Sequence, residues 1–425
     1  MAEQTTFEIV GATLVATKHP LNGKKIVLAV ESGRIKEISE YPKATKNSKS
    51  INGEGLSITP GFVDLLGSFC DPGMEHREDF LSGAEAALYG GYTHVGVNPF
   101  NEPVADSKSG ISYVKAANQS SKINLLPLGT LSVGGANTDI PELHDMAHTG
   151  AYAFFSGKKQ LSEKLLLTAL EYCQGIDALP MVFPIVDSLA EEGQINESIV
   201  SSQTGLKAIP NIAESMALAN ILKLAKYSGG SVHISHISCE ESVALIKKAK
   251  EEGVRVTCAV ASHQLIHTDK DCLDFDTRHK VLPPYRKEQD RQALISACKE
   301  GIVDAIISDH SPVDIEAKKT EFDHAEFGII NFQTAFSSLW AADVLPIDKL
   351  VELMAENPAK ILKLKTVGFE IGTEANFNLI ATDKKYNFPV AEVKSKSLNS
   401  PFLNKELKGE ILYTAAKGKL YSKIG

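Results

Sequence analysis

The chain has 425 residues, of which 43% are hydrophobic, and a formal net charge of -9. This length suffices for one large domain and a smaller one, with ample material for a buried core. Lys and Arg are dispersed among Asp and Glu, so the basic stripe that neutralises phosphates is missing and we expect no nucleic-acid binding.

The sequence also argues against secretion and membrane insertion. Residues 1–10 lack a cationic region followed by an apolar core, and no run of about 18 apolar residues occurs. Six cysteines lie far apart without a Cys-x-x-Cys pair, which indicates small buried side chains and neither a disulfide framework nor a structural zinc site. We therefore expect a cytoplasmic protein that contacts no membrane.

Strand patterns dominate the first 58 residues. Short apolar stretches at 7–10, 13–15, 25–30 and 34–38 are separated by turn formers such as Asn22-Gly23 and Gly33. Similar stretches return near the other end, at 377–380, 408–414 and 418–421. We predict that residues 1–58 and 363–425 pair into one small β-sandwich domain.

Residues 59–362 instead alternate strand, loop and helix. The clearest unit is a strand at 230–238, a helix with Val243, Ile246 and Ala249 at helical spacing, and a second strand at 254–258. Further strands are expected at 92–97, 150–155, 180–183 and 305–309. Repeated βα units with polar residues at the strand ends predict an α/β fold, a (β/α)₈ barrel of the TIM type. The sequence contains no glycine-rich phosphate loop, which would have favoured a doubly wound sheet instead.

Several motifs in this central region occur in a characteristic order. They are Pro60-Gly61-Phe62-Val63-Asp64, Gly90-Gly91-Tyr92-Thr93, Gly205–Pro210, His233–Ser238, Lys280–Arg286, Ser308–Pro312 and Asn357–Leu362. The series resembles the dihydroorotase family of amidohydrolases, in particular its bacterial long-chain branch, over nearly the whole chain. The resemblance implies a hydrolase of a cyclic amide C–N bond in pyrimidine biosynthesis, in which six protein ligands hold one or two metals that deprotonate a water.

Four of the six metal-ligand positions implied by the resemblance carry unsuitable side chains. The positions of two alternating histidines, a bridging acid or carboxylated lysine, and a fifth-strand histidine are Leu66, Ser68, Ser156 and Pro184. Only His236 and Asp309 remain. A catalytic zinc normally needs three protein ligands and an open position, so we expect no cofactor, with zinc as the metal if the protein is active.

The positions that would bind substrate have changed in the same way. Where the family has an arginine, two asparagines and a histidine, this chain has Cys70, Phe100, Leu282 and Val313. A thiol cannot replace a charged bidentate fork, and the other changes replace polar groups by apolar ones. We expect these residues to bind no substrate.

The remaining polar residues have structural alternatives. His233 and His236 are three apart in a strand, so only one can face the barrel interior, and His236 is the better candidate. His236 is either a ligand or a structural histidine, and Asp309 either orients a water or amide or serves a vestigial hydrogen-bond network. His310 should point away from the interior, and we expect a loop role for His263. A new thiol site at Cys70, with Asp71 and His76, would require a base or cation beside the thiol.

We interpret the chain as a dihydroorotase homologue that has lost hydrolase activity and acts as a structural or regulatory partner. The resemblance implies aspartate carbamoyltransferase as that partner, because degenerate family members scaffold this enzyme, and it implies at least a homodimer. Two alternatives stay open. One is an active dihydroorotase, or a related cyclic-amide hydrolase, with an atypical metal at His236 and Asp309. The other is metal-free ligand binding in a residual pocket.

Overall fold

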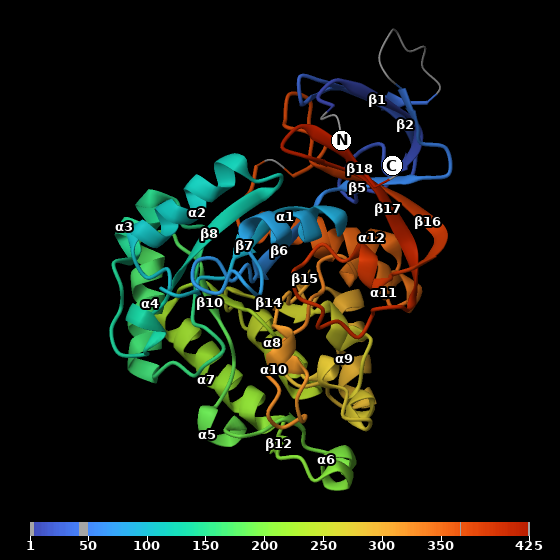
Figure 1. Cartoon of the computed structure of the whole chain (residues 1–425). Coiled ribbons are helices and arrows are strands. Elements are labelled where there is room, and N and C mark those ends of the chain that lie inside the picture. Colours follow the sequence, from blue (N-terminus) through green and yellow to red (C-terminus); the bar gives the residue numbers. More distant parts are fainter. Residues whose placement is uncertain (1–3, 42–49, 366, 424–425) are drawn as a thin grey trace.

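The computed structural model describes residues 4–41, 50–365 and 367–423 and brings both chain ends together in one sheet beside an α/β barrel (Figure 1). The strands of this sheet run in the order β18-β17-β16-β5-β1-β2-β3, with β4 pairing with β1. Their bounds are β1 Phe7–Leu14, β2 Lys25–Glu31, β3 Arg34–Glu40, β4 Ser50–Asn52, β5 Ser57–Pro60, β16 Phe377–Asn387, β17 Glu406–Ala416 and β18 Lys419–Ser422.

Pairing of β5 with both β1 and β16 joins the two ends of the chain. Phe7 and Phe377, one from each end, lie 6.1 Å apart between ring centroids in a core that also contains Ile9, Ile58 and Leu379. The two stretches expected at 7–10 and 13–15 form one strand, because a bulge at Gly11, with φ of 84°, lets β1 continue through the irregularity.

Eight parallel strands form the second sheet, in the order β6-β7-β8-β9-β10-β13-β14-β15. Since β15 also lies against β6, the sheet curves into a nearly closed barrel. The bounds are β6 Phe62–Gly67, β7 Tyr92–Val97, β8 Asn124–Thr130, β9 Ala153–Phe155, β10 Pro180–Val182, β13 Val232–Ile234, β14 Val256–Ala261 and β15 Ala305–Ile307. A separate short pair, β11 Ile195–Asn196 and β12 Ala208–Ile209, lies between β10 and β13 in the chain.

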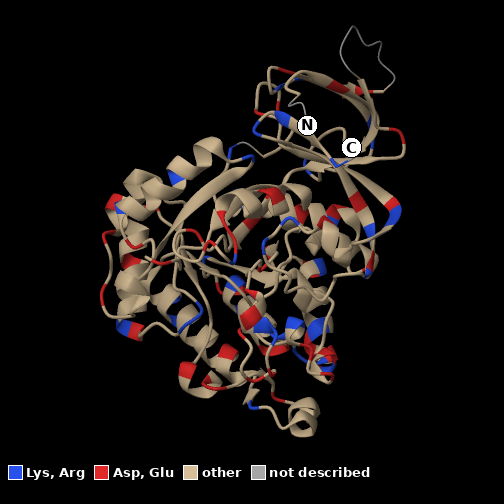
Figure 2. Cartoon of the chain, in the orientation of Figure 1, with Lys and Arg blue, Asp and Glu red and all other residues tan. Residues whose placement is uncertain are grey.

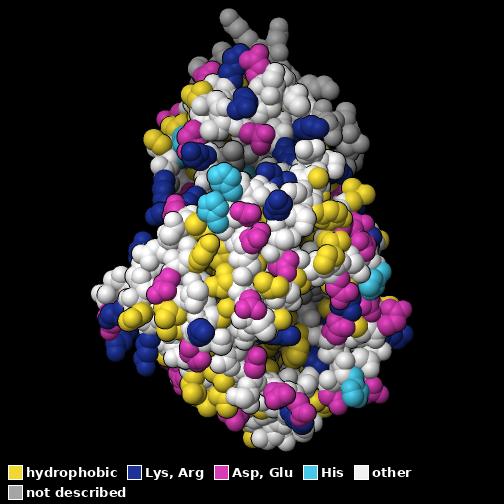
Figure 3. Space-filling model, turned by 90° about the vertical axis from the view of Figure 1, so that its left-hand side faces the viewer, with side chains coloured by type: hydrophobic (Ala, Val, Ile, Leu, Met, Phe, Trp, Pro, Cys, Tyr) yellow, Lys and Arg dark blue, Asp and Glu magenta, His cyan; other side chains and the backbone are white. Residues whose placement is uncertain are grey.

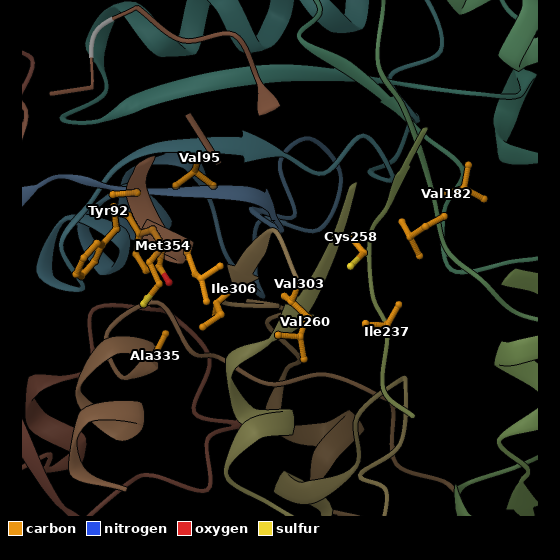
Figure 4. Packing of buried hydrophobic residues seen from close by; sticks show 14 of the residues in the cluster. Tyr92, Val95, Val182, Ile237, Cys258, Val260, Val303, Ile306, Ala335 and Met354 are labelled. Carbon is orange, nitrogen blue, oxygen red and sulfur yellow. The ribbon is translucent and has the colours of Figure 1, made fainter. Parts of the chain in front are cut away.

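Helices surround the barrel and complete its outer core. They are α1 Phe80–Tyr89, α2 Lys108–Ser120, α3 Leu143–Thr149, α4 Glu163–Gly175, α5 Asp187–Ala190, α6 Ile199–Thr204, α7 Ile212–Ser228, α8 Glu240–Glu251, α9 Glu288–Glu300, α10 Ile315–Lys318, α11 Ala335–Ala341, α12 Ile347–Val351 and α13 Asn357–Ile361. A π-helix, η5 Glu352–Glu356, joins α12 to α13. Short 3₁₀ helices are η1 Val133–Gly135, η2 Ser262–Leu265, η3 Asp269–Cys272, η4 Thr277–His279 and η6 Val390–Glu392. Figure 4 shows Val260 and Ile306 of the strands in one cluster with Ala335 and Met354 of the surrounding helices.

The predicted α/β fold class, a (β/α)₈ barrel with a small β domain formed from both termini, is confirmed, and the strands of that domain belong to one mixed sheet. All six cysteines are buried and free, as expected. Acidic and basic residues are dispersed over the ribbon in Figure 2, and on the face in Figure 3 charged side chains lie interspersed with hydrophobic ones. Of the helices in the described residues, none combines the length and the hydrophobicity that a membrane span requires.

Candidate functional site

The carboxylate of Asp309 is the centre of the polar cluster at the barrel mouth. Asp309 follows β15 and has a left-handed backbone with φ of 53°. Its Oδ1 lies 2.9 Å from Nζ of Lys158 and 3.1 Å from Nε2 of His236, and its Oδ2 lies 3.3 Å from Nε2 of His263. Burial alone would raise the pKa of Asp309, but these three partners outweigh burial and lower the pKa well below its usual range. Asp309 is therefore a carboxylate whose charge is balanced by a protein ammonium.

Lys158 reaches this carboxylate from the turn after β9. Gly157, with φ of 79°, directs the chain so that the lysine extends across the mouth. The ammonium donates to Asp309 Oδ1 and, at 2.8 Å, to the backbone carbonyl of Leu282. The side chain is 29% exposed, whereas that of Asp309 is 7% exposed. The ammonium thus lies on the solvent side of the carboxylate.

The two histidines beside Asp309 are fully buried. Nδ1 of His236 lies 3.0 Å from Oγ of Ser235, and its ring packs edge-on against Phe183 with 5.3 Å between centroids. Burial lowers the pKa of His236 and of His263, although Asp309 acts in the opposite direction. Both imidazoles are accordingly neutral near pH 7, and they hold Asp309 by hydrogen bonds.

None of the four degenerate ligand positions is among the hydrogen-bond partners of Asp309. Leu66 is buried in an apolar cluster that includes Phe155 and Phe183. Ser68 accepts a hydrogen bond from Asn98, at 3.0 Å, while Pro184 is buried after β10. Ser156 donates to the carbonyl of Gly157 at 2.8 Å and accepts from the amide of Phe183 at 3.0 Å. Its hydroxyl is therefore used in local backbone bonds.

These residues do not fit a divalent metal ion at the barrel mouth. The Lys158 ammonium would repel a second cation at the same carboxylate, and the Leu66 and Pro184 side chains have no lone pair to offer. Among the residues that the structure describes, the grouping of three side chains suited to a metal is His267, Asp271 and His279, and it does not include Asp309.

The degenerate substrate positions are mostly packed. Cys70 is buried, and burial raises the pKa of its thiol to about 12. Phe100 lies edge-on to Phe155 with 5.8 Å between centroids. Leu282 packs its side chain against the apolar cluster that contains Leu66 and Phe155, and its backbone carbonyl accepts from the Lys158 ammonium. Val313 lines a cavity of about 500 Å³ that Asp309 does not line, together with His76 and Asp276.

A cavity of about 300 Å³ remains at the barrel mouth. Its walls combine apolar and polar groups, among them Leu66, Ser68, Asn98, Phe100, Phe155, Lys158 and Asp309. The cavity is large enough for a small molecule. It offers a lysine ammonium, an asparagine amide and a serine hydroxyl for hydrogen bonding.

The other histidines lie where their spacing suggests or make contacts that the sequence did not reveal. Nδ1 of His233 lies 2.8 Å from Oγ1 of Thr257, and His233 is not among the hydrogen-bond partners of Asp309. His310 stacks on Phe332 at 3.9 Å, and its Nδ1 accepts from the amide of Asn331 at 3.0 Å. His263, for which we expected only a loop role, contacts Asp309 directly.

Lys158 and His263 are the two members of the cluster that sequence reasoning missed. Each lies close after the end of a barrel strand, where functional side chains of this fold gather, and that position was the available signal. The thiol site considered at Cys70 is not supported, because His76 and Asp71 contact other residues. His76 lies 3.8 Å from Asp314, and the Asp71 carboxylate accepts from the hydroxyl of Tyr113 at 2.7 Å.

Comparisons with known proteins place this architecture in a family. Residues 55–242 match the model described as Dihydro-orotase-like. The dihydroorotase of Citrifermentans bemidjiense is 35% identical over 396 residues, covering 92% of this chain and 93% of that protein. The dihydroorotase of Acetivibrio thermocellus is 35% identical over 418 residues, covering 97% and 98%.

Solved structures agree on the fold. The L-hydantoinase (dihydropyrimidinase) of Arthrobacter aurescens superposes with a TM-score of 0.88 at 21% identity, covering 99% of this chain and 96% of that one. The D-hydantoinase of a Thermus species gives a TM-score of 0.83 at 18% identity, covering 97% and 94%. With sequence similarity to dihydroorotases over nearly its full length, the chain belongs to the dihydroorotase family.

Proposed function

We propose that this protein is a dihydroorotase homologue without hydrolase activity, which acts as a structural or regulatory partner in pyrimidine biosynthesis. The observation that supports this most is the Lys158–Asp309 ion pair. In an active family member the eighth-strand carboxylate holds a metal. Here the same carboxylate is neutralised by an ammonium and held by two neutral imidazoles.

An ammonium cannot take over the chemical role of the metal. A bound divalent cation lowers the pKa of a water and stabilises the developing negative charge. An ammonium has no open coordination position, and a lysine whose donors are directed at Asp309 and Leu282 cannot activate a water in that way. The site supports binding of a small polar ligand better than it supports hydrolysis.

The test is an activity assay on the purified protein, prepared from a host that lacks any other dihydroorotase. Interconversion of carbamoyl aspartate and dihydroorotate is measured with added zinc or manganese, and an active dihydroorotase serves as the positive control. We expect no turnover above the protein-free background. Turnover that disappears in Asp309→Asn would contradict the proposal.

For the partner, we propose aspartate carbamoyltransferase from the same organism, bound to at least a dimer of this chain. The family resemblance supports this choice, and the retained full-length fold is what a scaffold requires. Light scattering after size-exclusion chromatography measures the mass of the chain alone and of the mixture. A stable co-eluting complex is expected with aspartate carbamoyltransferase and none with ornithine carbamoyltransferase, the matched control. Separate elution of this chain and aspartate carbamoyltransferase would reject the partner.

An active enzyme with an atypical metal is the second candidate. The cavity of about 300 Å³ lined by Lys158 and Asp309 favours it, because a binding space persists. This candidate requires the Lys158 ammonium to leave Asp309. It therefore predicts that Lys158→Met gains metal affinity at the barrel mouth, whereas the scaffold proposal predicts that the variant remains inactive with zinc present.

A further inference from the structure

The segment between β14 and α9 contains a cluster of metal-binding side chains apart from the Asp309 site. His267 follows η2, Asp271 lies in η3 and His279 ends η4. One potential ligand atom from each of the three residues lies within 4.8 Å of the others. Nδ1 of His267 and Oδ1 of Asp271 are 3.2 Å apart. Two ligands of one tetrahedral zinc lie roughly 3.3 Å apart, given metal–ligand distances of 2.0–2.1 Å.

The carboxylate of Asp271 is already oriented for such a role. Its Oδ2 accepts from the backbone amide of Thr268 at 2.8 Å, as part of the cap of η3. The other oxygen, Oδ1, is thereby fixed on the side of His267. A carboxylate held by one oxygen, with the other oxygen directed at the imidazole of a second candidate ligand, is well placed to be a monodentate ligand.

Both imidazoles have nitrogens that the protein leaves without a partner. Nδ1 of His279 and Nε2 of His267 are buried and make no hydrogen bond. The rings lie 4.9 Å apart between centroids, and His267 packs against Tyr285, at 5.1 Å, and Phe402, at 5.3 Å. Buried polar atoms without partners are costly. A cation bound through Nδ1 of His267 leaves Nε2 of that ring unchanged, so the unpartnered nitrogen that it would satisfy is Nδ1 of His279.

Solvent can still reach the cluster. The side chain of Asp271 is 37% exposed and that of His267 is 14% exposed. An ion could therefore enter without unfolding the segment and keep a water as its remaining ligand.

We propose that His267, Asp271 and His279 bind one zinc ion. Two imidazoles and one carboxylate form a donor set that suits Zn²⁺, with Co²⁺ as its usual spectroscopic substitute, and not the all-oxygen set of Ca²⁺ or Mg²⁺. The same segment presents His263 to Asp309 and the Leu282 carbonyl to Lys158. The zinc ion stabilises this segment and thereby the His263–Asp309 and Leu282–Lys158 contacts of the barrel-mouth cluster.

The experiment uses the full chain, freed of metal with a chelator and titrated with zinc chloride by calorimetry. We expect one zinc per chain, and an affinity at least about tenfold weaker in His279→Gln and in Asp271→Asn. His324→Gln, which changes an exposed histidine outside the cluster, is the matched control and should bind like the unaltered protein. The absorption of tetrahedral Co²⁺ should appear in the unaltered chain and in the control alone.

Two cluster variants are used so that the test survives if one of them does not fold. Circular dichroism in the absence of metal checks the folding of each variant. Absence of stoichiometric zinc in the unaltered chain would overturn the inference. Zinc affinity retained by either folded cluster variant would also overturn it, and would direct attention to the barrel mouth. The proposed lack of hydrolase activity does not depend on this outcome, because activity is measured separately and Asp309 lies outside the cluster.

Discussion

Lys158 determines the electrostatics of the barrel mouth. Asp309 is buried and charged, and Lys158 is the cation that balances it at 2.9 Å. Removing one partner of a buried ion pair leaves an uncompensated charge, which costs more than the pair itself contributes.

We predict that Lys158→Met lowers the free energy of unfolding by about 2 kcal/mol, less than for a fully buried pair because the lysine is partly exposed. The neighbouring exposed Lys159→Met is the matched control and should change stability by less than about 0.5 kcal/mol. Urea unfolding at pH 7 measures both. Equal stabilities of the two variants would show that the ion pair does not hold Asp309.

A second prediction at the scale of a single residue concerns His233 and the pH dependence of the free energy of unfolding. Burial lowers the pKa of this histidine to about 3, with His236 and Lys250 acting in the same direction. The unfolded chain, with an ordinary histidine pKa of about 6.5, therefore takes up a proton before the folded chain does, and stability falls as the pH drops below that value.

Between pH 6.5 and pH 5 the loss attributable to His233 is about 2 kcal/mol. In His233→Gln this part of the pH dependence should disappear, whereas the exposed His324→Gln should keep it. Urea unfolding curves at the two pH values measure the difference. Parallel losses in His233→Gln and in the unaltered protein would contradict the assignment.

At the scale of elements, the turn after β9 positions Lys158. Gly157 has φ of 79°, and a Cβ at this position would lie 2.5 Å from Cζ of Phe100. Gly253, after α8, has the same φ, but a Cβ there would meet nothing within 4 Å. The two glycines therefore separate backbone strain from steric overlap.

We predict that Gly253→Ala costs about 1 kcal/mol, from the left-handed backbone alone. Gly157→Ala should cost about 2–3 kcal/mol, since the Phe100 ring must also move. Chemical denaturation gives both values. If the two substitutions cost the same, Phe100 does not pack closely on this turn.

At the scale of the whole molecule, the fold was predictable because its signals are local and repeated. Strand and helix patterns of residues 59–362 recur often enough to specify a barrel, and the strands of both ends have matching alternation. The exact strand ends were less predictable. The strand expected at 230–238 ends at Ile234, where the chain turns to present Ser235 and His236 at the mouth.

The site was predictable only where a residue type excludes a role. Leu66 and Pro184 cannot ligate a metal in any conformation, so the sequence sufficed for them. The contacts of Lys158 and His263 with Asp309 join residues 151 and 46 positions apart, and no local pattern encodes such a pairing. The cluster of His267, Asp271 and His279 was missed for a similar reason, because a loop with three short 3₁₀ turns has no regular spacing to read.

The cysteines give a prediction for the folded molecule as a whole. All six are buried, and burial raises the pKa of each thiol, to about 12 for Cys70. Because the thiolate is the reactive form, we expect no thiol to react with a chromogenic disulfide reagent before unfolding and all six to react in denaturant. Rapid reaction of a thiol in the native protein that is lost in Cys70→Ser would revive the thiol site.

The most direct measurement is a crystal structure of the protein grown with zinc, in which anomalous scattering locates every bound metal ion. We predict that the Lys158 ammonium contacts Asp309 and that no zinc lies between His236 and Asp309. A zinc ion coordinated by those two side chains, with Lys158 displaced into solvent, would contradict it.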